Sequence, residues 1–203
     1  MKKSTCKSLA LILATLFLLL GLAACGDGGT SANRDEAEKY LSQGIDARDA
    51  ENLDEALAAF NKAIELDPGY AEAYFYRARV NTRLQAFDKA FADYDKAIEL
   101  DPKDADSWYF RASLYEDAEN YDKALEGYSK AIELSPQEDV QYYGRAGLYF
   151  TLEMYDEALA DLDKAIGMDP TDADYYEARG MVYEALGEDD LAEADYAMAA
   201  ELG

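Results

Sequence analysis

The amino-acid sequence predicts an all-α protein, a solenoid of five stacked helix-turn-helix repeats. The first observation is a strict period: the only prolines are Pro68, Pro102, Pro136 and Pro170, and each follows the last by 34 residues. The second is that small residues and large apolar residues recur in separate columns at the same spacing. Two closely packed helices need large side chains in fixed register with small ones. A period of this length indicates copies of one unit stacked along an axis.

The repeat boundaries follow from aligning the chain at this spacing. Three columns hold only alanine or glycine: Gly44, Ala78, Ala112, Ala146 and Gly180; Ala56, Ala90, Ala124, Ala158 and Ala192; and Ala63, Ala97, Ala131, Ala165 and Ala199. An aromatic column holds Tyr40, Tyr74, Trp108, Tyr142 and Tyr176. We therefore expect one repeat domain over residues 37–203, with repeats 37–70, 71–104, 105–138, 139–172 and a shortened 173–203.

These columns resemble the tetratricopeptide repeat (TPR) family, and the resemblance covers residue 37 to the end. It implies a right-handed α-solenoid in which the first helix of each repeat lines a concave groove that binds extended or helical peptides. Chaperone-binding members use a lysine and asparagine clamp for a terminal carboxylate. That clamp is absent, because the matching places hold Phe75, Arg79, Tyr109 and Ser113. A receptor for chaperone tails is therefore not expected.

Residues 1–24 are predicted to be a lipoprotein signal peptide. Lys2, Lys3 and Lys7 precede the apolar run LALILATLFLLLGLAA, which is short for a membrane span and ends at Cys25. The stretch LAAC resembles a bacterial lipobox, which implies lipid attachment to Cys25 and cleavage before it. The alternative is an ordinary signal peptide with Cys25 incidental. We favour lipidation, because the charged start, the apolar run and the small residues all end at that cysteine.

Residues 25–36 are expected to be the lipidated cysteine and a flexible tether. The sequence GDGGTSANR has no apolar periodicity, and glycine and serine favour a flexible coil. This predicts an extracytoplasmic, membrane-anchored lipoprotein of a bacterial cell envelope, held through the lipid alone. Which membrane carries it is left open.

Acidic residues and prolines predict where the helices begin and end. The second helices open with acids that the free amides and the positive end of the helix dipole favour: Asp54, Asp88, Asp122, Asp156 and Asp190. Asp104 and Asp172 do the same for first helices. The prolines end the second helices, because they disfavour helical geometry in the preceding residue. Aspartate clusters at 101–106 and 169–174 lack the glycine and terminal glutamate of a calcium loop, so we interpret them as caps.

Composition argues against catalysis and against nucleic acid. The formal charge is -24 and there is no histidine. Nucleic-acid binding rests on cationic side chains, and the same charge disfavours docking on an anionic lipid surface. The commonest general base and metal ligand is missing, and no serine stands in a nucleophile elbow or phosphate loop. We expect a non-enzymatic protein without cofactor or metal; a hydrolase that uses carboxylates alone is the open alternative.

A column of arginines recurs on the packed side of the first helices, at positions 77, 111, 145 and 179. In three repeats an aspartate follows sixteen residues later, facing back from the second helix. Because buried charges must be paired, we predict structural ion pairs here and prefer them to an anion site. The predicted pairs are Arg77 with Asp93, Arg145 with Asp161, and Arg179 with Asp195. Repeat three has Gly127 at this place, which leaves Glu126 as a less certain partner of Arg111.

The opposite side of the first helices is the candidate ligand groove. By helical spacing its residues point away from the core, and exposed aromatic side chains suit a peptide with apolar anchors. The predicted groove residues are Arg48, Phe75, Tyr76, Arg79, Arg83, Tyr109, Phe110, Tyr143 and Phe150. The alternative is that these aromatic side chains pack on the neighbouring helix. Arginines lie toward the amino-terminal end and acids such as Glu116 toward the other, so a ligand with two charged ends would have a preferred direction.

The leading hypothesis is a lipid-anchored protein-interaction scaffold that holds a protein or peptide of the envelope through the groove. A receptor for cell-wall glycans or muropeptides is the second hypothesis, because aromatic faces also stack on sugar rings. A self-associating structural module is the third. The identity of the partner is not predicted.

Overall fold

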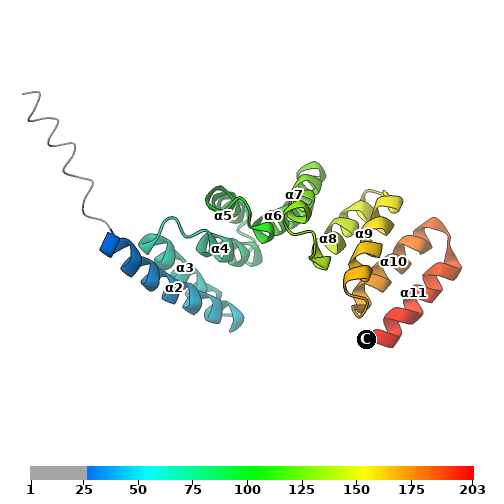
Figure 1. Ribbon diagram of the computed structural model, residues 1–203, viewed down its shortest axis with the longest axis horizontal. Helices are drawn as coiled ribbons and strands as arrows, with labels where there is room; N and C mark the ends of the chain where they lie inside the picture. The colour runs from blue at the N-terminus through cyan, green and yellow to red at the C-terminus, as the bar shows by residue number, and fades with distance from the viewer. Residues whose placement is uncertain (1–26) are drawn as a thin grey trace, which may run out of the picture.

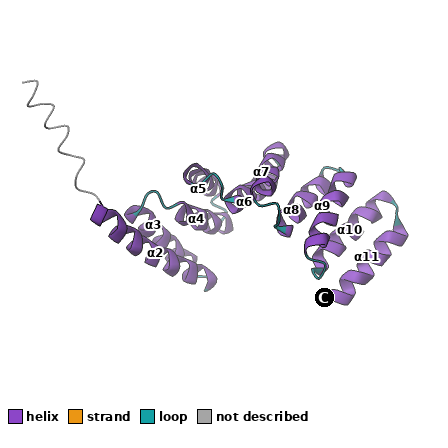
Figure 2. Cartoon of the chain, in the orientation of Figure 1, coloured by secondary structure: helices purple, strands orange, loops and turns teal. Residues whose placement is uncertain are grey.

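The computed structural model describes residues 27–203, which form ten helices and no strand (Figure 1, Figure 2). The predicted signal peptide and Cys25 lie outside the described residues. The helices are α2 (Asp27–Asp49), α3 (Leu53–Leu66), α4 (Ala71–Arg83), α5 (Phe87–Leu100), α6 (Ala105–Asp117), α7 (Tyr121–Leu134), α8 (Asp139–Thr151), α9 (Tyr155–Met168), α10 (Ala173–Leu186) and α11 (Asp189–Leu202). From α4 onward, every first helix begins at the first residue of a 34-residue unit.

Each repeat is a pair of packed helices, and the pairs stack in chain order as an α-solenoid of five repeats (Figure 1). Within residues 27–203, the first helices of successive repeats contact one another, α2 with α4, α4 with α6, α6 with α8 and α8 with α10. The second helices of successive described repeats make no such contact. The first helices therefore lie on the inner side of the curve and the second helices on the outer side.

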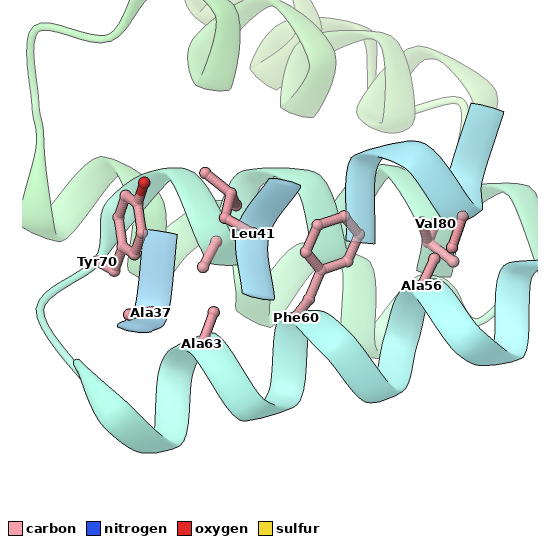
Figure 3. Close-up of a cluster of buried hydrophobic side chains, with 9 residues drawn as sticks. Ala37, Leu41, Ala56, Phe60, Ala63, Tyr70 and Val80 are labelled. Atoms are coloured by element: carbon pink, nitrogen blue, oxygen red, sulfur yellow. The ribbon is translucent and has the colours of Figure 1, made fainter. Parts of the chain in front are cut away.

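The core consists of large side chains set against small ones, as the first repeat shows (Figure 3). Phe60 of α3 is fully buried against α2, where a Cβ atom at Gly44 would lie 2.4 Å from its ring. In the last repeat, a Cβ atom at Gly180 would lie 2.7 Å from the ring of Tyr196. An aromatic ring thus lies directly on the backbone of the facing helix, which explains glycine at both positions.

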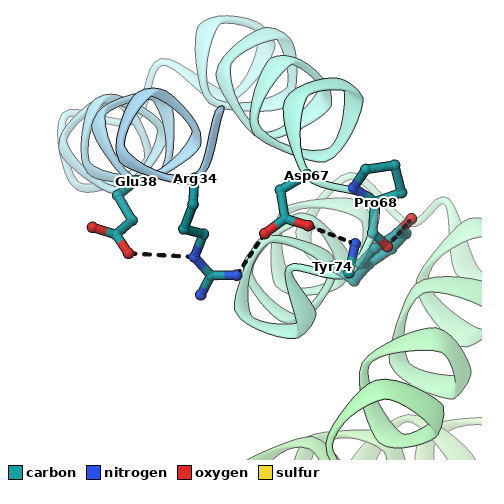
Figure 4. A network of polar contacts seen from close by, with 6 residues as sticks. Arg34, Glu38, Asp67, Pro68 and Tyr74 are labelled. Atoms are coloured by element: carbon teal, nitrogen blue, oxygen red, sulfur yellow. Dashed lines mark hydrogen bonds and ion pairs between the residues drawn. The ribbon is translucent and has the colours of Figure 1, made fainter. Parts of the chain in front are cut away.

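One contact explains why the proline and aromatic columns share a period. In each of four turns, an aromatic side chain of the first helix donates a hydrogen bond to the carbonyl oxygen of the proline before it; Figure 4 shows the one from Tyr74 to Pro68. The donors are Tyr74 to Pro68 (3.4 Å), Trp108 to Pro102 (3.2 Å), Tyr142 to Pro136 (3.3 Å) and Tyr176 to Pro170 (3.3 Å). The turn between repeats is therefore tied to the helix that follows it.

The turn inside each repeat contains one residue in the left-handed conformation. These residues are Glu51 (φ 65°), Gln85 (57°), Glu119 (56°), Glu153 (58°) and Gly187 (77°). The sequence did not predict this column, because only its last member is glycine. The left-handed conformation costs a residue with a side chain roughly 1 kcal/mol relative to the right-handed one, so four of the five turns are strained.

The first helix is longer than the sequence predicts. α2 begins at Asp27, so residues 27–36, which we expected to form a flexible tether, are helical. Arg34 anchors this part of the helix, because it donates to Asp67, the residue that follows α3, at 2.7 Å and to Glu38 at 3.3 Å (Figure 4). Its guanidinium also lies 3.5 Å from the ring centre of Tyr70 and lowers the pKa of the Asp67 carboxyl.

Candidate functional site

The arginine column forms bidentate ion pairs within three repeats. Each guanidinium donates through Nε and Nη2 to both oxygens of a buried aspartate on the second helix. The pairs are Arg77 with Asp93 (2.9 and 2.6 Å), Arg145 with Asp161 (2.7 and 2.9 Å) and Arg179 with Asp195 (2.7 and 2.8 Å). Asp161 raises the pKa of Arg145. These are the pairs that the sixteen-residue spacing predicts.

The same arginines also reach the second helix of the preceding repeat. The Nη1 acceptors are Asn61 for Arg77 (2.6 Å), Ser129 for Arg145 (3.0 Å) and Asp163 for Arg179 (2.6 Å). Each arginine therefore joins three helices. This geometry gives the column a structural role in stacking the repeats.

Repeat three departs from this arrangement. Gly127 stands in the place of the aspartate, so Arg111 lacks the bidentate contact and keeps the contact to the preceding repeat that the other arginines also make, donating through Nη1 to Asp95 at 2.5 Å. Glu126, the partner that the sequence suggested, is exposed and does not bond it. A Cβ atom at Gly127 would lie 2.8 Å from that of Ala112, so α6 and α7 approach too closely for an aspartate. Within residues 27–203, the Nε atom of Arg111 is buried without a hydrogen-bond partner.

Several aromatic side chains predicted to line the groove are packed between successive first helices. Phe75 is 7% exposed, so the prediction that it faces the groove is wrong. Its ring lies 5.1, 6.2 and 5.6 Å from the ring centres of Tyr76, Tyr94 and Phe110. The series continues from Phe110 to Tyr109 at 5.3 Å. Helical spacing predicts only how a side chain is directed relative to the second helix of its own repeat. Here the first helix of the next repeat also packs on the Phe75 side chain.

Three predicted groove arginines surround a cavity of about 350 Å³ in the amino-terminal half of the inner face. Arg48, Arg79 and Arg83 line it together with Asp49 and Glu51. Arg83 pairs with Glu51, and Arg48 with Asp49 at 2.8 Å. Arg79 lies over an aromatic ring, 4.5 Å from its centre. The arginines outnumber the acids, so this cavity favours an anionic group in a protein that is otherwise strongly acidic.

Repeat four forms an apolar hollow of about 270 Å³, to which α8 and α10 contribute most of the lining residues. Tyr143 and Phe150, two of the predicted groove residues, line it together with the exposed Met181 of α10. Gly144 and Gly147 of α8 line it as well. Unlike the packed aromatic residues of repeats two and three, this part of the inner face is open.

Two glycines of α8 line the hollow where repeats two and three carry larger residues. In the 34-residue alignment, the counterparts of Gly144 in those two repeats are Tyr76 and Phe110, and those of Gly147 are Arg79 and Ser113. A Cβ atom at Gly144 would lie 2.7 Å from the ring of Tyr109, which occupies this space. A Cβ atom at Gly147 would meet no atom within 4 Å. The sequence contains this signal, because both glycines stand out when the repeats are aligned.

One carboxylate lies in the hollow. Glu116 of α6 accepts a hydrogen bond at 2.7 Å from the hydroxyl of Tyr128, which also lines the hollow. Burial raises the pKa of Glu116. Burial, together with the bond to Glu116, raises the pKa of the Tyr128 hydroxyl. Apolar walls beside one acceptor suit an apolar side chain with a hydrogen-bond donor next to it.

In the part of the chain that the structure describes, no three side chains of histidine, cysteine, aspartate and glutamate are placed to hold a metal ion. None of the described helices is both long enough and apolar enough to cross a membrane.

Three family models match the chain, and all three describe tetratricopeptide repeats. The matches cover residues 41–105, 105–138 and 147–187. The chain belongs to the tetratricopeptide repeat family. The matched segments of this TPR protein include every helix from α3 to α7 and lie within the five repeats that the structure contains.

Solved structures share the fold at low sequence identity. A crystal structure of MamA has a TM-score of 0.71 and 23% identity, covering 83% of this chain and 92% of that one. PilF of Pseudomonas aeruginosa has a TM-score of 0.79 and 18% identity, covering 85% and 78%. YrrB, described as a TPR protein with an unusual peptide-binding site, has a TM-score of 0.66 and 23% identity, covering 87% and 92%. At these identities the likeness concerns the fold.

One curated relative is matched over a short stretch. Uncharacterized protein MJ0572 of Methanocaldococcus jannaschii is 41% identical over 46 residues, which are 23% of this chain and 54% of that protein. The TPR chain spans about half the length of this relative.

Proposed function

We propose that this TPR protein is a non-enzymatic interaction scaffold that binds a peptide or protein partner along its inner face. The apolar hollow of repeat four carries the proposal. Glycine inside a helix is about 0.5–1 kcal/mol less favourable than alanine, and packing does not require it at Gly147. Glycine at this position lowers helix stability and leaves open space beside the helix. An anchoring side chain from a partner fits into such a space.

The partner's chemistry follows from the two cavities. An apolar side chain fills the hollow beside Met181, and a hydrogen-bond donor next to it meets Glu116. An acidic group of the same partner binds at the arginine-lined cavity near Arg79. Because the two cavities differ in charge and polarity, the partner has one preferred direction along the groove. The peptide-binding site named for YrrB supports a peptide as the class of ligand.

A lipid on Cys25 anchors the scaffold to a membrane of a bacterial envelope, on an extracytoplasmic face. The basic start, the apolar run and the small residues before Cys25 support this location. The test is metabolic labelling with a tagged fatty acid: the unchanged protein should take up the label, and a Cys25→Ala variant should not. An unchanged protein that takes up no label contradicts lipid anchoring through this residue.

Filling the hollow without disturbing the helix tests the binding site. Gly147→Leu places a side chain in open space, and Gly167→Leu is the matched control, because Gly167 of α9 also has no atom within 4 Å of its Cβ position but does not line the hollow. Both variants replace a helical glycine, so neither should lose stability.

Each protein serves as bait on detergent-solubilised bacterial envelope. A partner retained by the unchanged protein and by Gly167→Leu, but lost with Gly147→Leu, supports the hollow as the anchor site. If all three baits retain the same proteins, the hollow is not the site of binding.

A further inference from the structure

The last helix, α11, differs from the other second helices in two columns that are charged in every other repeat. Leu191 aligns with Glu55, Lys89, Lys123 and Glu157. Met198 aligns with Lys62, Lys96, Lys130 and Lys164. In repeats one to three, the lysine of the second column pairs with a glutamate three residues later, at 3.0, 2.9 and 2.8 Å. Repeats one to four thus cover this surface with charge, and the fifth does not.

The replacements lie on one face of the helix. Leu191, Ala194, Met198 and Leu202 follow one another at spacings of three and four residues, which places them in a single stripe. Leu191 is 47% exposed, Met198 40% and Leu202 37%. These side chains are therefore uncovered in the structure.

The stripe is not simply the surface on which a further repeat would pack. In the other repeats, that contact uses the columns of Phe91 and Ile98. The ring centre of Phe91 lies 4.6 Å from that of Tyr115 in the following first helix, and Ile64, the counterpart of Ile98 in repeat one, packs against the cluster that includes Val80 of α4. In α11 those columns carry Glu193 and Ala200, so their apolar bulk is gone. Apolar residues have been lost from one face of α11 and gained on another. That change needs an explanation of its own.

Charge indicates what covers the stripe. α11 contains five acidic residues and neither lysine nor arginine. Among residues 27–203, only one of these acids, Asp195, is neutralised in an ion pair, with Arg179. A second copy of the chain would bring two such acidic helices together. A partner with basic residues beside its own apolar stripe would instead be attracted.

We propose that α11 docks a basic amphipathic helix of a partner protein, through the stripe formed by Leu191, Ala194, Met198 and Leu202. This surface lies on a second helix, so it is separate from the inner face. The helix lays its apolar side on the stripe and its lysine or arginine side chains beside the acids of α11. A protein with both surfaces can hold two partners at once.

A synthetic probe tests the proposal. The probe is a fluorescein-labelled peptide of 14 residues, the length of α11, with leucines at i, i+3, i+7 and i+11 and lysines on both flanks. Its control has the same composition with the leucines dispersed around the helix. We expect the patterned peptide to bind the full chain, measured by fluorescence anisotropy, and the dispersed one to bind at least about tenfold more weakly.

Variants of the protein locate the site. Leu191→Gln with Met198→Gln leaves the charge unchanged and should weaken binding of the patterned peptide by about tenfold or more. Leu84→Gln with Val140→Gln is the control, because these side chains are 43% and 44% exposed elsewhere, and it should leave binding unchanged. Equal binding of both peptides, or no effect of the α11 variant, overturns the proposal. A dimer in sedimentation that only the α11 variant abolishes would overturn it in favour of a second copy.

Discussion

Repeats three and four share one 34-residue pattern, and each departs from it through glycine, at one position in repeat three and at two in repeat four. Repeat three keeps the aromatic Phe110 on the inner face and has Gly127 where the others carry the buried aspartate. Repeat four keeps Asp161 and has Gly144 and Gly147 on the inner face. A Cβ atom at Gly127 would lie against the facing helix, whereas one at Gly147 would meet nothing.

A glycine within a helix therefore has different structural effects at different positions of the repeat. At Gly127 it permits a close helix contact that excludes an ion pair. At Gly147 it opens a hollow and leaves the ion pair of Arg145 intact. In α8, the ion pair on the packed side and the hollow on the inner side are therefore compatible with each other.

The largest effect is expected from removing the buried aspartate of repeat four. Asp161→Ala leaves Arg145 without its bidentate partner in a site where both side chains are mostly buried, so unfolding should become easier by about 3–5 kcal/mol. In repeat three, Asp95→Ala should cost only about 1 kcal/mol, because Asp95 is exposed and Arg111 keeps its contacts with the rings of Trp108 and Tyr115.

Urea unfolding, followed by the far-ultraviolet circular dichroism of the helices, measures the unfolding free energy that each variant loses. The double variant Arg145→Met with Asp161→Leu is the control, and it should recover most of the stability because no charge is left unpaired. Equal losses for Asp161→Ala and Asp95→Ala would contradict the contrast between the two repeats.

A second prediction asks whether the aspartate can be restored to repeat three. Gly127→Asp supplies the missing partner of Arg111, yet it should lower stability by about 1–3 kcal/mol, because its Cβ atom would lie 2.8 Å from that of Ala112 and 3.3 Å from the carbonyl oxygen of Trp108. Adding Ala112→Gly removes one of these clashes and should recover part of the loss. A single variant Gly127→Asp that is more stable than the unchanged protein would show that helix spacing does not exclude the aspartate.

The fold was predictable because its signals repeat. Four prolines and three small-residue columns set the helix starts at Ala71, Ala105, Asp139 and Ala173. The ion pairs were predictable for the same reason, since a constant separation of sixteen residues places arginine opposite aspartate in three repeats. The substitution of Gly127 already indicated an exception, but the contact that Arg111 keeps, to Asp95 of the preceding repeat, was not predicted.

The inner face was less predictable, because its burial depends on how one repeat rotates against the next. Phe75 was expected to point away from its own partner helix, but its ring lies between Tyr94 of that helix and Phe110 of the following repeat and is buried there. The left-handed residues were missed because four of the five have side chains, such as Glu119. The helical segment before residue 37 was missed because its anchor, Arg34 on Asp67, joins residues far apart in the sequence.

A third prediction sharpens the comparison within α8. Gly147→Ala should raise stability by about 0.5–1 kcal/mol, because it improves helix propensity without a clash. Gly144→Ala should not, because its Cβ atom would lie 2.7 Å from the ring of Tyr109. Thermal unfolding of the two variants, which differ by one turn of the same helix, measures the contrast. A gain at both positions would show that the Tyr109 ring moves aside at no cost.

The smallest expected effect is a dependence of stability on pH. It arises from one more difference between the repeats: Glu116 of repeat three aligns with Phe150 of repeat four. Burial raises the folded-state pKa of Glu116, so the folded protein holds this proton more tightly than the unfolded chain. The group therefore favours folding below its unfolded pKa of about 4.3, and that contribution is lost as pH rises through the folded value. Glu116→Gln keeps an acceptor for Tyr128 and removes the titration.

We expect Glu116→Gln to melt about 1–3 °C higher than the unchanged protein at pH 7, with a difference that shrinks as pH falls toward 4. Glu184→Gln is the matched control, since Glu184 accepts the same bond from Tyr196, at 2.8 Å, on an exposed surface. Thermal melts between pH 4 and pH 8 measure both variants. A lower melting temperature for Glu116→Gln at pH 7 would mean that the charged carboxylate stabilises the hollow, and a bound partner would then have to supply a cation beside its apolar anchor.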